Sequence, residues 1–429
     1  MSLKRILVVA CWCCGMAALP VVAAMVFHPL QMPDTAVVAE DDFSDLAPLG
    51  QAIGDKRVVM LDELTHGEGN VFASKSRIVQ YLHQQKGFDV LVLESGLFDV
   101  DRIWQSQQDI QQQAPGNIFY MYARSSEMQS LFQYIHQARH SSQPLALAGF
   151  DGRFSGELSL QYLVAEFRDY VAAQLSATGP EAYFLQLQQL LEGQFSAEDP
   201  GSQQQFLSRN KHVASLLQAK MQADGAMEAG FWYRINASLR KMAQVAWQQR
   251  RFDEHDLAMA ANLQWLIEQQ YAGHKIIVWG HYIHLNRQGG FEHALHKPET
   301  PIEQRSKVAN MTSALPEAIR KQTYVLHFAG AQGSYIDFRD MQEIQVESGD
   351  DMMEQFLTEQ AGGDVFVSLQ QVAPAANRLL WGHEYKSTLS WQQAQQRFDG
   401  MILLHSLTPT QQLDREQSDV ASPELDKLQ

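Results

Sequence analysis

Short runs made up mostly of apolar residues recur along this chain of 429 residues, separated by turns and by segments with helical spacing. The first run, residues 58–61, leads into a polar turn at 62–70. Apolar residues at helical spacing follow as far as Gly87, and a second buried strand is expected at residues 89–93, where four apolar residues follow Asp89. A strand, a turn, a helix and a strand in this order are typical of a parallel sheet. Similar runs at 145–148, 276–279 and 324–328 predict an α/β fold with a mostly parallel central sheet flanked by helices.

The middle of the chain, residues 157–272, has helical periodicity instead. Two apolar stripes carry this pattern: Leu160, Leu163, Phe167, Tyr170 and Val171, and then Met259, Leu263, Leu266 and Ile267. We therefore predict a mostly helical insertion at 157–272 that covers the site. The insertion belongs to a single domain at 46–412, which a linker at 28–45 precedes and a frayed tail at 413–429 follows.

The N-terminus has the pattern of an export segment. Lys4 and Arg5 precede an uncharged apolar stretch, residues 6–27. This predicts, within residues 1–27, either a secretory signal peptide or a single uncleaved anchor that attaches the chain to a membrane. The body is then exported, either into the periplasm or held on the inner membrane facing the periplasm.

Several classes of function are excluded. All three cysteines, at positions 11, 13 and 14, fall in the N-terminal segment, so the exported body has no disulfide, thiolate metal site or cysteine nucleophile. The formal net charge of −16 disfavours nucleic acid and anionic lipid surfaces as partners, because both are also negative. The chain contains no Gly-x-Ser-x-Gly elbow, no P-loop and no Gly-x-Gly-x-x-Gly after a strand. A water nucleophile activated by histidine and glutamate is the simplest remaining chemistry.

Four titratable side chains lie just past the carboxyl ends of four of the predicted strands: His66, Glu94, Asp151 and His281. Ligands bind at the carboxyl edge of the strands in open α/β sheets, so these side chains predict a common site. His66 can both take and give a proton near neutral pH. Glu63 is near enough along the turn to orient the ring of His66. Glu94, at the end of an apolar strand, is a candidate base or a second orienting group.

Neighbouring side chains are candidates for binding. Lys75, on the helix after His66, is a candidate partner for an anion or oxyanion. His281 and His284 are a weak metal pair without a third ligand, so we expect His281 to act as a second imidazole. Three of the candidates also have a purely structural interpretation. His66 could cap the helix that follows it, Glu94 could accept hydrogen bonds from loop amides, and Asp151 could form a turn.

Several segments resemble the erythromycin esterase-like family. They are Glu63-Leu64-Thr65-His66-Gly67, the strand ending in Leu93-Glu94-Ser95-Gly96, the turn Gly149-Phe150-Asp151, and Asp256, Met259-Ala260 and Asn262 followed by Val278-Trp279-Gly280-His281 and His284. Leu407-Thr408-Pro409 also fits. Each motif is short, but their order and spacing between residues 45 and 412 are fairly specific.

The resemblance implies a metal-independent esterase without a cofactor. It places the family's catalytic histidine on His66, the acidic partners on Glu63 and Glu94, and a second histidine on His281. We expect four further residues to contact the substrate: Lys75, Asp151, His284 and Asp256.

Four positions depart from the family pattern. Asp62 replaces a usual glycine, His255 an arginine, and Tyr282 an asparagine, and Lys75 stands where the family often has arginine. These positions lie at or near the expected site, so we do not expect macrolide lactones to be the substrate.

We therefore predict an exported hydrolase of a small-molecule carboxylic ester or lactone. Two other interpretations stay open. The same His and Glu cluster is also an N/O ligand set for a divalent ion, in a metal-dependent hydrolase or a metal-binding module. Alternatively, the chain is a non-catalytic envelope protein that keeps only the fold.

Overall fold

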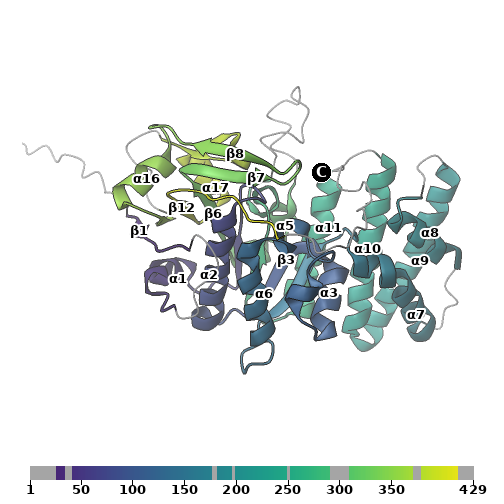
Figure 1. Cartoon of the computed structure of the whole chain (residues 1–429). Helices are drawn as coiled ribbons and strands as arrows, with labels where there is room; N and C mark the ends of the chain where they lie inside the picture. Colours follow the sequence, from purple (N-terminus) through teal and green to yellow (C-terminus); the bar gives the residue numbers. More distant parts are fainter. Residues whose placement is uncertain are drawn as a thin grey trace, which may run out of the picture.

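The computed structural model describes residues 26–33, 41–175, 181–195, 199–248, 252–289, 309–370 and 378–413. Within these residues, the centre is an eight-stranded sheet with the order β1-β9-β12-β6-β2-β5-β3-β4 (Figure 1). Neighbouring strands from β12 to β4 run parallel, whereas β9 and β1 add to one edge in antiparallel fashion. The predicted α/β class with a mostly parallel sheet is therefore confirmed.

The strand bounds agree closely with the apolar runs. The strands of the sheet are β1 (His28–Pro29), β2 (Val58–Leu61), β3 (Val90–Gly96), β4 (Ala146–Asp151), β5 (Ile276–Trp279), β6 (Thr323–Gly330), β9 (Val365–Ser368) and β12 (Gly400–Leu404). The sequence did not predict β1, β9 or β12. Residues 28–29, expected in a linker, pair with β9 at the sheet edge.

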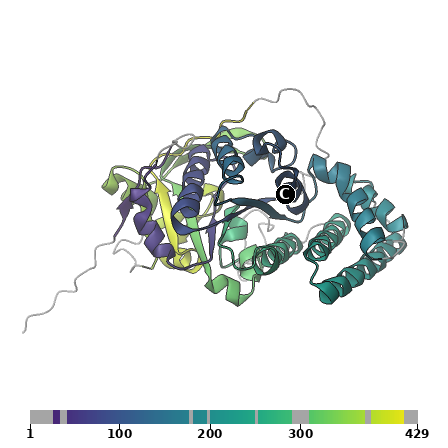
Figure 2. The ribbon, with the colours of Figure 1, turned by 90° about the horizontal axis from the view of Figure 1, so that it is seen from below.

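Both faces of the sheet are buried, which explains why its strands read as unbroken apolar runs. In β2, Val58 and Met60 face one hydrophobic core, and Val59 and Leu61 face the other. Figure 2 shows helices on both sides of the sheet. On the Val59 side they include α2 (Gly69–Lys86) and α6 (Ser126–Ala138), and on the Met60 side α11 (Phe252–Trp265) and α14 (Met311–Ala314).

The remaining helices and turns connect these layers. Near the N-terminus and on the α2 side they are η1 (Ser44–Leu46), α1 (Ala47–Ile53), α3 (Leu97–Ser106), α4 (Ile110–Gln113) and α5 (Tyr120–Ala123). After β5 they are α12 (Tyr282–Leu285), α15 (Glu317–Lys321), α16 (Met353–Ala361), η4 (His383–Tyr385) and α17 (Trp391–Arg397). Helix α2 ends where the sequence predicts, because Gly87 adopts a left-handed conformation (φ 71°).

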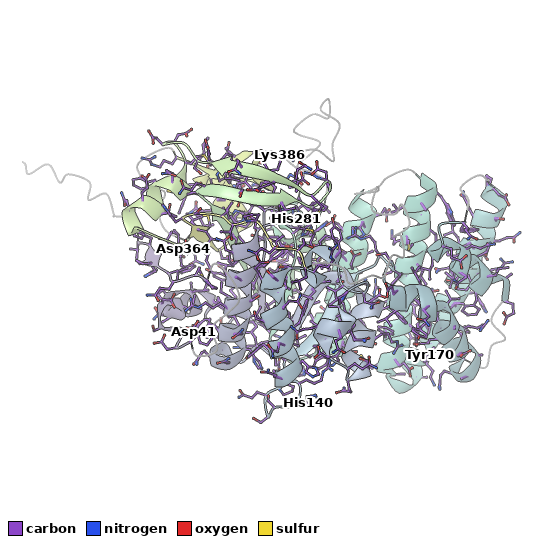
Figure 3. All side chains as sticks on the ribbon, in the orientation of Figure 1. Asp41, His140, Tyr170, His281, Asp364 and Lys386 are labelled. Carbon is purple, nitrogen blue, oxygen red and sulfur yellow. The ribbon has the colours of Figure 1, made fainter. Side chains whose placement is uncertain are left out.

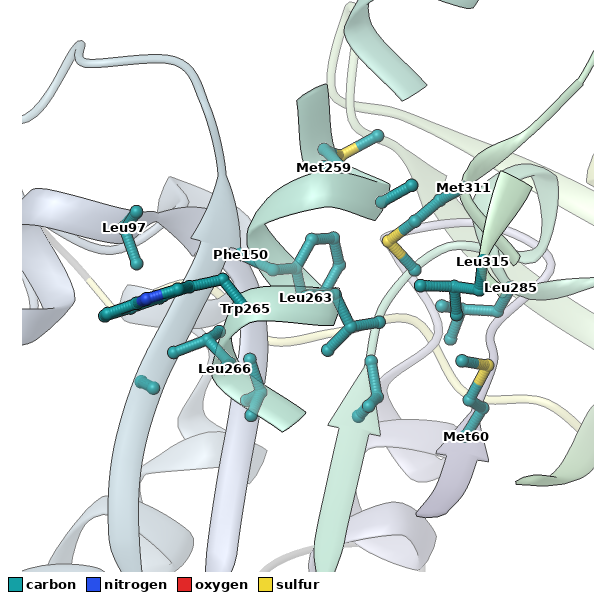
Figure 4. Close-up of a cluster of buried hydrophobic side chains, with 14 of the residues drawn as sticks. Met60, Leu97, Phe150, Met259, Leu263, Trp265, Leu266, Leu285, Met311 and Leu315 are labelled. Carbon is teal, nitrogen blue, oxygen red and sulfur yellow. The ribbon is translucent and has the colours of Figure 1, made fainter. Parts of the chain in front are cut away.

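The predicted insertion is helical. It comprises η2 (Ser159–Leu163), α7 (Val164–Gln174), α8 (Glu181–Leu191), α9 (Pro200–Asp224), α10 (Met227–Gln248), α11 and η3 (Leu266–Gln270). Helices α7 to α10 lie beside the sheet as a bundle rather than over its strand ends, and α11 joins this bundle to the sheet (Figures 1 and 2). The stripe predicted on α11 is buried, and Figure 4 shows Leu263 gathered with Phe150 and Met311.

Two small hairpins complete the described fold. They are β7 (Gln332–Asp337) with β8 (Gln342–Glu347), and β10 (Leu379–Trp381) with β11 (Thr388–Ser390). No helix among the described residues is long and apolar enough to cross a membrane. The predicted export segment at 1–27 falls almost entirely outside the described residues, as does nearly all of the predicted tail at 413–429.

Candidate active site

The turn that carries His66 is held by backbone hydrogen bonds from two other segments of the chain. The carbonyl oxygen of Gly67 accepts hydrogen bonds from the N–H of Ile336 in β7 (3.1 Å) and from that of Thr410 near the C-terminus (2.9 Å). A Cβ atom on residue 67 would lie 1.7 Å from the Ile336 carbonyl oxygen, so only glycine allows this approach. Two segments far apart in the sequence therefore hold the turn in place.

Glu63 is the centre of a buried network. Its Oε1 lies 3.1 Å from His66 Nδ1 and accepts a hydrogen bond from the Tyr122 hydroxyl at 2.5 Å. Its Oε2 accepts a hydrogen bond from Lys75 Nζ. Lys75 is fully buried, with its ammonium 4.2 Å from the ring centroid of Trp279. Lys75 therefore holds Glu63 instead of facing a substrate, which corrects the binding role expected from the sequence.

This network determines which nitrogen of His66 is available. The Glu63 carboxylate accepts, so Nδ1 carries the proton and Nε2 keeps its lone pair. Nε2 makes no hydrogen bond to the described residues. Burial lowers the pKa of His66 well below its ordinary range, and the nearby cationic groups add to this shift. His66 is thus a neutral base at neutral pH, oriented by Glu63.

Glu94 and His281 meet across adjacent strands. Leu93 pairs with Trp279, so Glu94 lies level with Gly280, and its Oε2 accepts the backbone N–H of His281 at 2.6 Å. The His281 ring is 4.6 Å from that of His66. Its Nε2 donates to the Leu64 carbonyl (3.1 Å), and its Nδ1 faces the N–H of Ile283 (3.4 Å). His281 is therefore held by backbone and packs against His66.

His284 is the charged histidine of the site. Its Nδ1 lies 2.8 Å from Asp256 Oδ1, and its Nε2 lies 3.4 Å from Glu94 Oε1. Burial alone would lower its pKa, but the carboxylates of Asp256 and Glu94 outweigh burial and raise it to about 9. His284 and Asp256 are both buried, so Asp256 positions His284 rather than reaching a substrate as expected.

The charge of His284 makes a testable contribution to stability. Its folded-state pKa is above its ordinary 6.5, so this contribution is fully present below pH 6.5 and is lost as pH rises through about 9. We expect His284→Gln to lower the free energy of unfolding on the order of 3 kcal/mol more at pH 6 than at pH 10. Urea denaturation at both pH values measures this difference. The control His140→Gln changes an exposed histidine that has no carboxylate partner among the described residues and should show no such dependence. Equal losses at both pH values for His284→Gln would contradict the assignment.

Asp151 also holds another side chain. It accepts hydrogen bonds from the Arg153 backbone (2.9 Å) and side chain (2.7 Å), and His255 Nε2 lies 3.6 Å away. Burial opposes ionisation of Asp151, but Arg153 and His255 hold its pKa down at about 2. The Asp151 carboxylate is therefore occupied by Arg153, and the side chain that reaches solvent here is that of Arg153, which is 39% exposed.

Asp62, one of the departures from the family pattern, points to the neighbouring strand. Its carboxylate binds His327 Nδ1 (2.8 Å) and the backbone N–H of Phe328 (2.9 Å). His327 also stacks on Phe398, with ring centroids 4.1 Å apart. Asp62 therefore joins the end of β2 to β6 and fixes the start of the His66 turn.

A different set of side chains has the arrangement of metal ligands. Within the described part of the chain, ligand atoms of His281, His383 and Glu384 lie within 4.8 Å of one another. This set shares only His281 with the ligand set considered from the sequence. Glu384 already accepts hydrogen bonds from Arg339 (2.9 Å) and Lys386 (2.6 Å), and a divalent cation would be repelled by both. The arrangement therefore favours metal binding only weakly.

Sequence reasoning missed several residues around His66. Tyr122 comes from the short helix α5, and the rings of Phe119 and Phe338 lie 4.8 and 5.0 Å from that of His66. No local pattern marks these three, because only the fold brings them to the site. His383 and Glu384 do have a signal: an apolar run and Gly382 precede them, just as Trp279 and Gly280 precede His281.

Comparisons with known proteins agree with this architecture. A Bacillus cereus protein of known structure has a TM-score of 0.70, at 18% identity, over 91% of this chain and 97% of its own. A histidine-to-asparagine mutant of the erythromycin esterase EreC, in its open conformation, has a TM-score of 0.64 at 15% identity, over 88% of this chain and 97% of its own. At these identities the likeness concerns the fold.

Sequence comparison identifies the family. The curated protein "Putative hydrolase YbfO" of Bacillus subtilis (strain 168) is 25% identical over 406 residues, which cover 85% of this chain and 87% of that protein. The sequence model of the family described as erythromycin esterase matches residues 83–407, well over half of the chain. The chain therefore belongs to the erythromycin esterase family.

Proposed function

We propose that this chain is an exported hydrolase that cleaves a carboxylic ester or lactone with water activated by His66. Family membership supports a hydrolase. The observation that carries the mechanism is the buried Lys75–Glu63–His66 series, which leaves Nε2 of His66 as a free base. Export is supported by the basic and apolar pattern at residues 4–27.

The mechanism assigns each group a separate task. His66 Nε2 removes a proton from water, and Glu63 stabilises the imidazolium that forms. His281 positions the His66 ring. The imidazolium of His284, fixed by Asp256 and Glu94, supplies positive charge toward the developing oxyanion. In this scheme His284 takes the electrostatic role expected of Lys75, because Lys75 is buried behind Glu63.

A panel of esters tests this proposal. The purified full-length chain is assayed against simple alkyl esters, lactones and macrolides, with and without a chelator. We expect chelator-resistant turnover of one class of ester or lactone. Turnover that is abolished by chelation and restored by a divalent metal would instead favour the His281–His383–Glu384 grouping as a metal site.

The non-catalytic interpretation predicts a different result. A protein that keeps only the fold would turn over none of these compounds, with or without added metal.

The assays use the whole chain rather than a protein that lacks the N-terminal segment. Strand β1 begins at His28, so removing residues 1–34 would also remove this edge strand of the sheet.

A further inference from the structure

The side chains that reach solvent near His66 include three cations, although the chain as a whole is strongly acidic. The side chains of Arg153, Arg339 and Lys386 are 39%, 41% and 49% exposed. The carboxylates that hold them are much less exposed, at 4% for Asp151, 12% for Asp337 and 6% for Glu384. The acidic partners thus lie inside and the cationic groups lie outside.

Arg339 lies close to His66, with the ring of Phe338 against both side chains. It follows Phe338, whose ring is 5.0 Å from that of His66, and its guanidinium lies 5.5 Å from the Phe338 ring centroid. Asp337 binds it through Nε and Nη2, and Glu384 binds Nη2 at 2.9 Å. Its Nη1 makes no hydrogen bond to a described residue, so two N–H groups remain available in a fixed position.

Lys386 and Arg153 extend this cationic surface. Lys386 Nζ binds Glu384 at 2.6 Å, which uses one of the three donors of an ammonium group. Figure 3 shows Lys386 and His281 in the same region, near the β7–β8 hairpin. Arg153 and Arg339 are both among the charges that lower the pKa of His66, so both act on the proposed base.

Resting on the proposed ester hydrolysis, we propose that the substrate carries an anionic group, a carboxylate or another oxyanion, a few bonds from the ester carbonyl, and that Arg339 binds it. Guanidinium groups suit this task because their planar donors match the oxygens of such anions. Arg153 and Lys386 add positive charge around the same group and disfavour a cationic substrate.

Two esters of nearly equal size test the proposal: ethyl hydrogen glutarate, which ends in a carboxylate, and ethyl valerate, which ends in a methyl group. Values of kcat/KM for both are measured with the full-length chain. We expect the anionic ester to be preferred by about tenfold or more, the magnitude of a charge-assisted hydrogen bond. Arg339→Gln should bring the ratio close to one, and Arg339→Lys should retain part of it. The control Arg168→Gln alters an arginine of α7 with a 47% exposed side chain and should keep the wild-type ratio.

The outcomes separate this inference from the proposed function. Equal or better turnover of ethyl valerate by the wild type would overturn the anionic substrate and leave ester hydrolysis standing. If neither ester is cleaved, the proposed hydrolysis of such esters is contradicted. Calorimetric titration with glutarate then tests the anion site by itself. Saturable binding that is lost in Arg339→Gln supports the anion site, and no saturable binding to the wild type overturns it.

Discussion

Replacing His66 with asparagine is expected to lower kcat/KM for the cleaved ester by about 10² to 10⁴, the usual effect of losing a general base. Asparagine keeps a polar group near Glu63 but has no nitrogen lone pair that can accept a proton from water. The measurement is initial-rate kinetics on the ester identified by the panel. Thermal unfolding of the same samples verifies that the variant is folded.

A matched control separates the loss of the base from the loss of any histidine. His140→Asn changes an exposed histidine, labelled in Figure 3, and should leave the rate within about twofold of the wild type. Because burial lowers the pKa of His66, wild-type kcat/KM should begin to fall only below pH 6.5. A His66→Asn variant with near wild-type rates would show that water is activated elsewhere.

Removing the Nζ group of Lys75 is expected to destabilise the fold by about 3 to 5 kcal/mol. Burial lowers the pKa of Lys75, but the Glu63 carboxylate in contact with Nζ stabilises the charged form, and the substitution leaves this buried carboxylate without its cation. Lys75→Met keeps most of the side-chain volume, so packing against Trp279 changes little. Chemical denaturation of the wild type and the variant gives the difference in the free energy of unfolding.

The double variant Lys75→Met with Glu63→Gln shows whether charge is the cause. Removing both charges should recover much of the lost stability while activity stays low, since the neutral amide that replaces the Glu63 carboxylate cannot stabilise a His66 imidazolium. Lys321→Met is the matched control, because Lys321 forms an exposed ion pair with Glu317 and should lose no more than about 1 kcal/mol. A Lys75→Met loss as small as that of Lys321→Met would mean that the buried pair does not hold Glu63 in place.

The local sequence was sufficient to predict the α/β class. Strands buried on both faces are apolar throughout, as in β2 and β5, and helices that cover them repeat at helical spacing, as in α11. The strand ends were therefore visible as changes from apolar to titratable residues. These changes mark His66, Glu94 and His281 as candidate site residues from the sequence pattern alone.

The edge strands and hairpins were less visible. Strand β12 is apolar throughout, but only the Leu407-Thr408-Pro409 segment that follows it was recognised, as part of the family resemblance. Strands β7 and β8 are mostly polar or mixed in character, and their loop brings Phe338 and Arg339 to the site. Their position depends on contacts with Gly67 and the C-terminal segment, which no local pattern records.

The sequence by itself determined which side chains lie at the strand ends. Each buried strand must consist of apolar residues, so its end is marked by the first polar residues that follow. Only the tertiary structure decided which of them meet. Strand β5 enters the sheet between β2 and β3, although β3, β4 and the helical insertion precede it in the chain. That order places His281 between the His66 turn and Glu94, and it depends on contacts between segments far apart in the chain rather than on any local preference. The tertiary structure also buries Lys75 against Glu63 and leaves Arg153 and Arg339 partly exposed near His66.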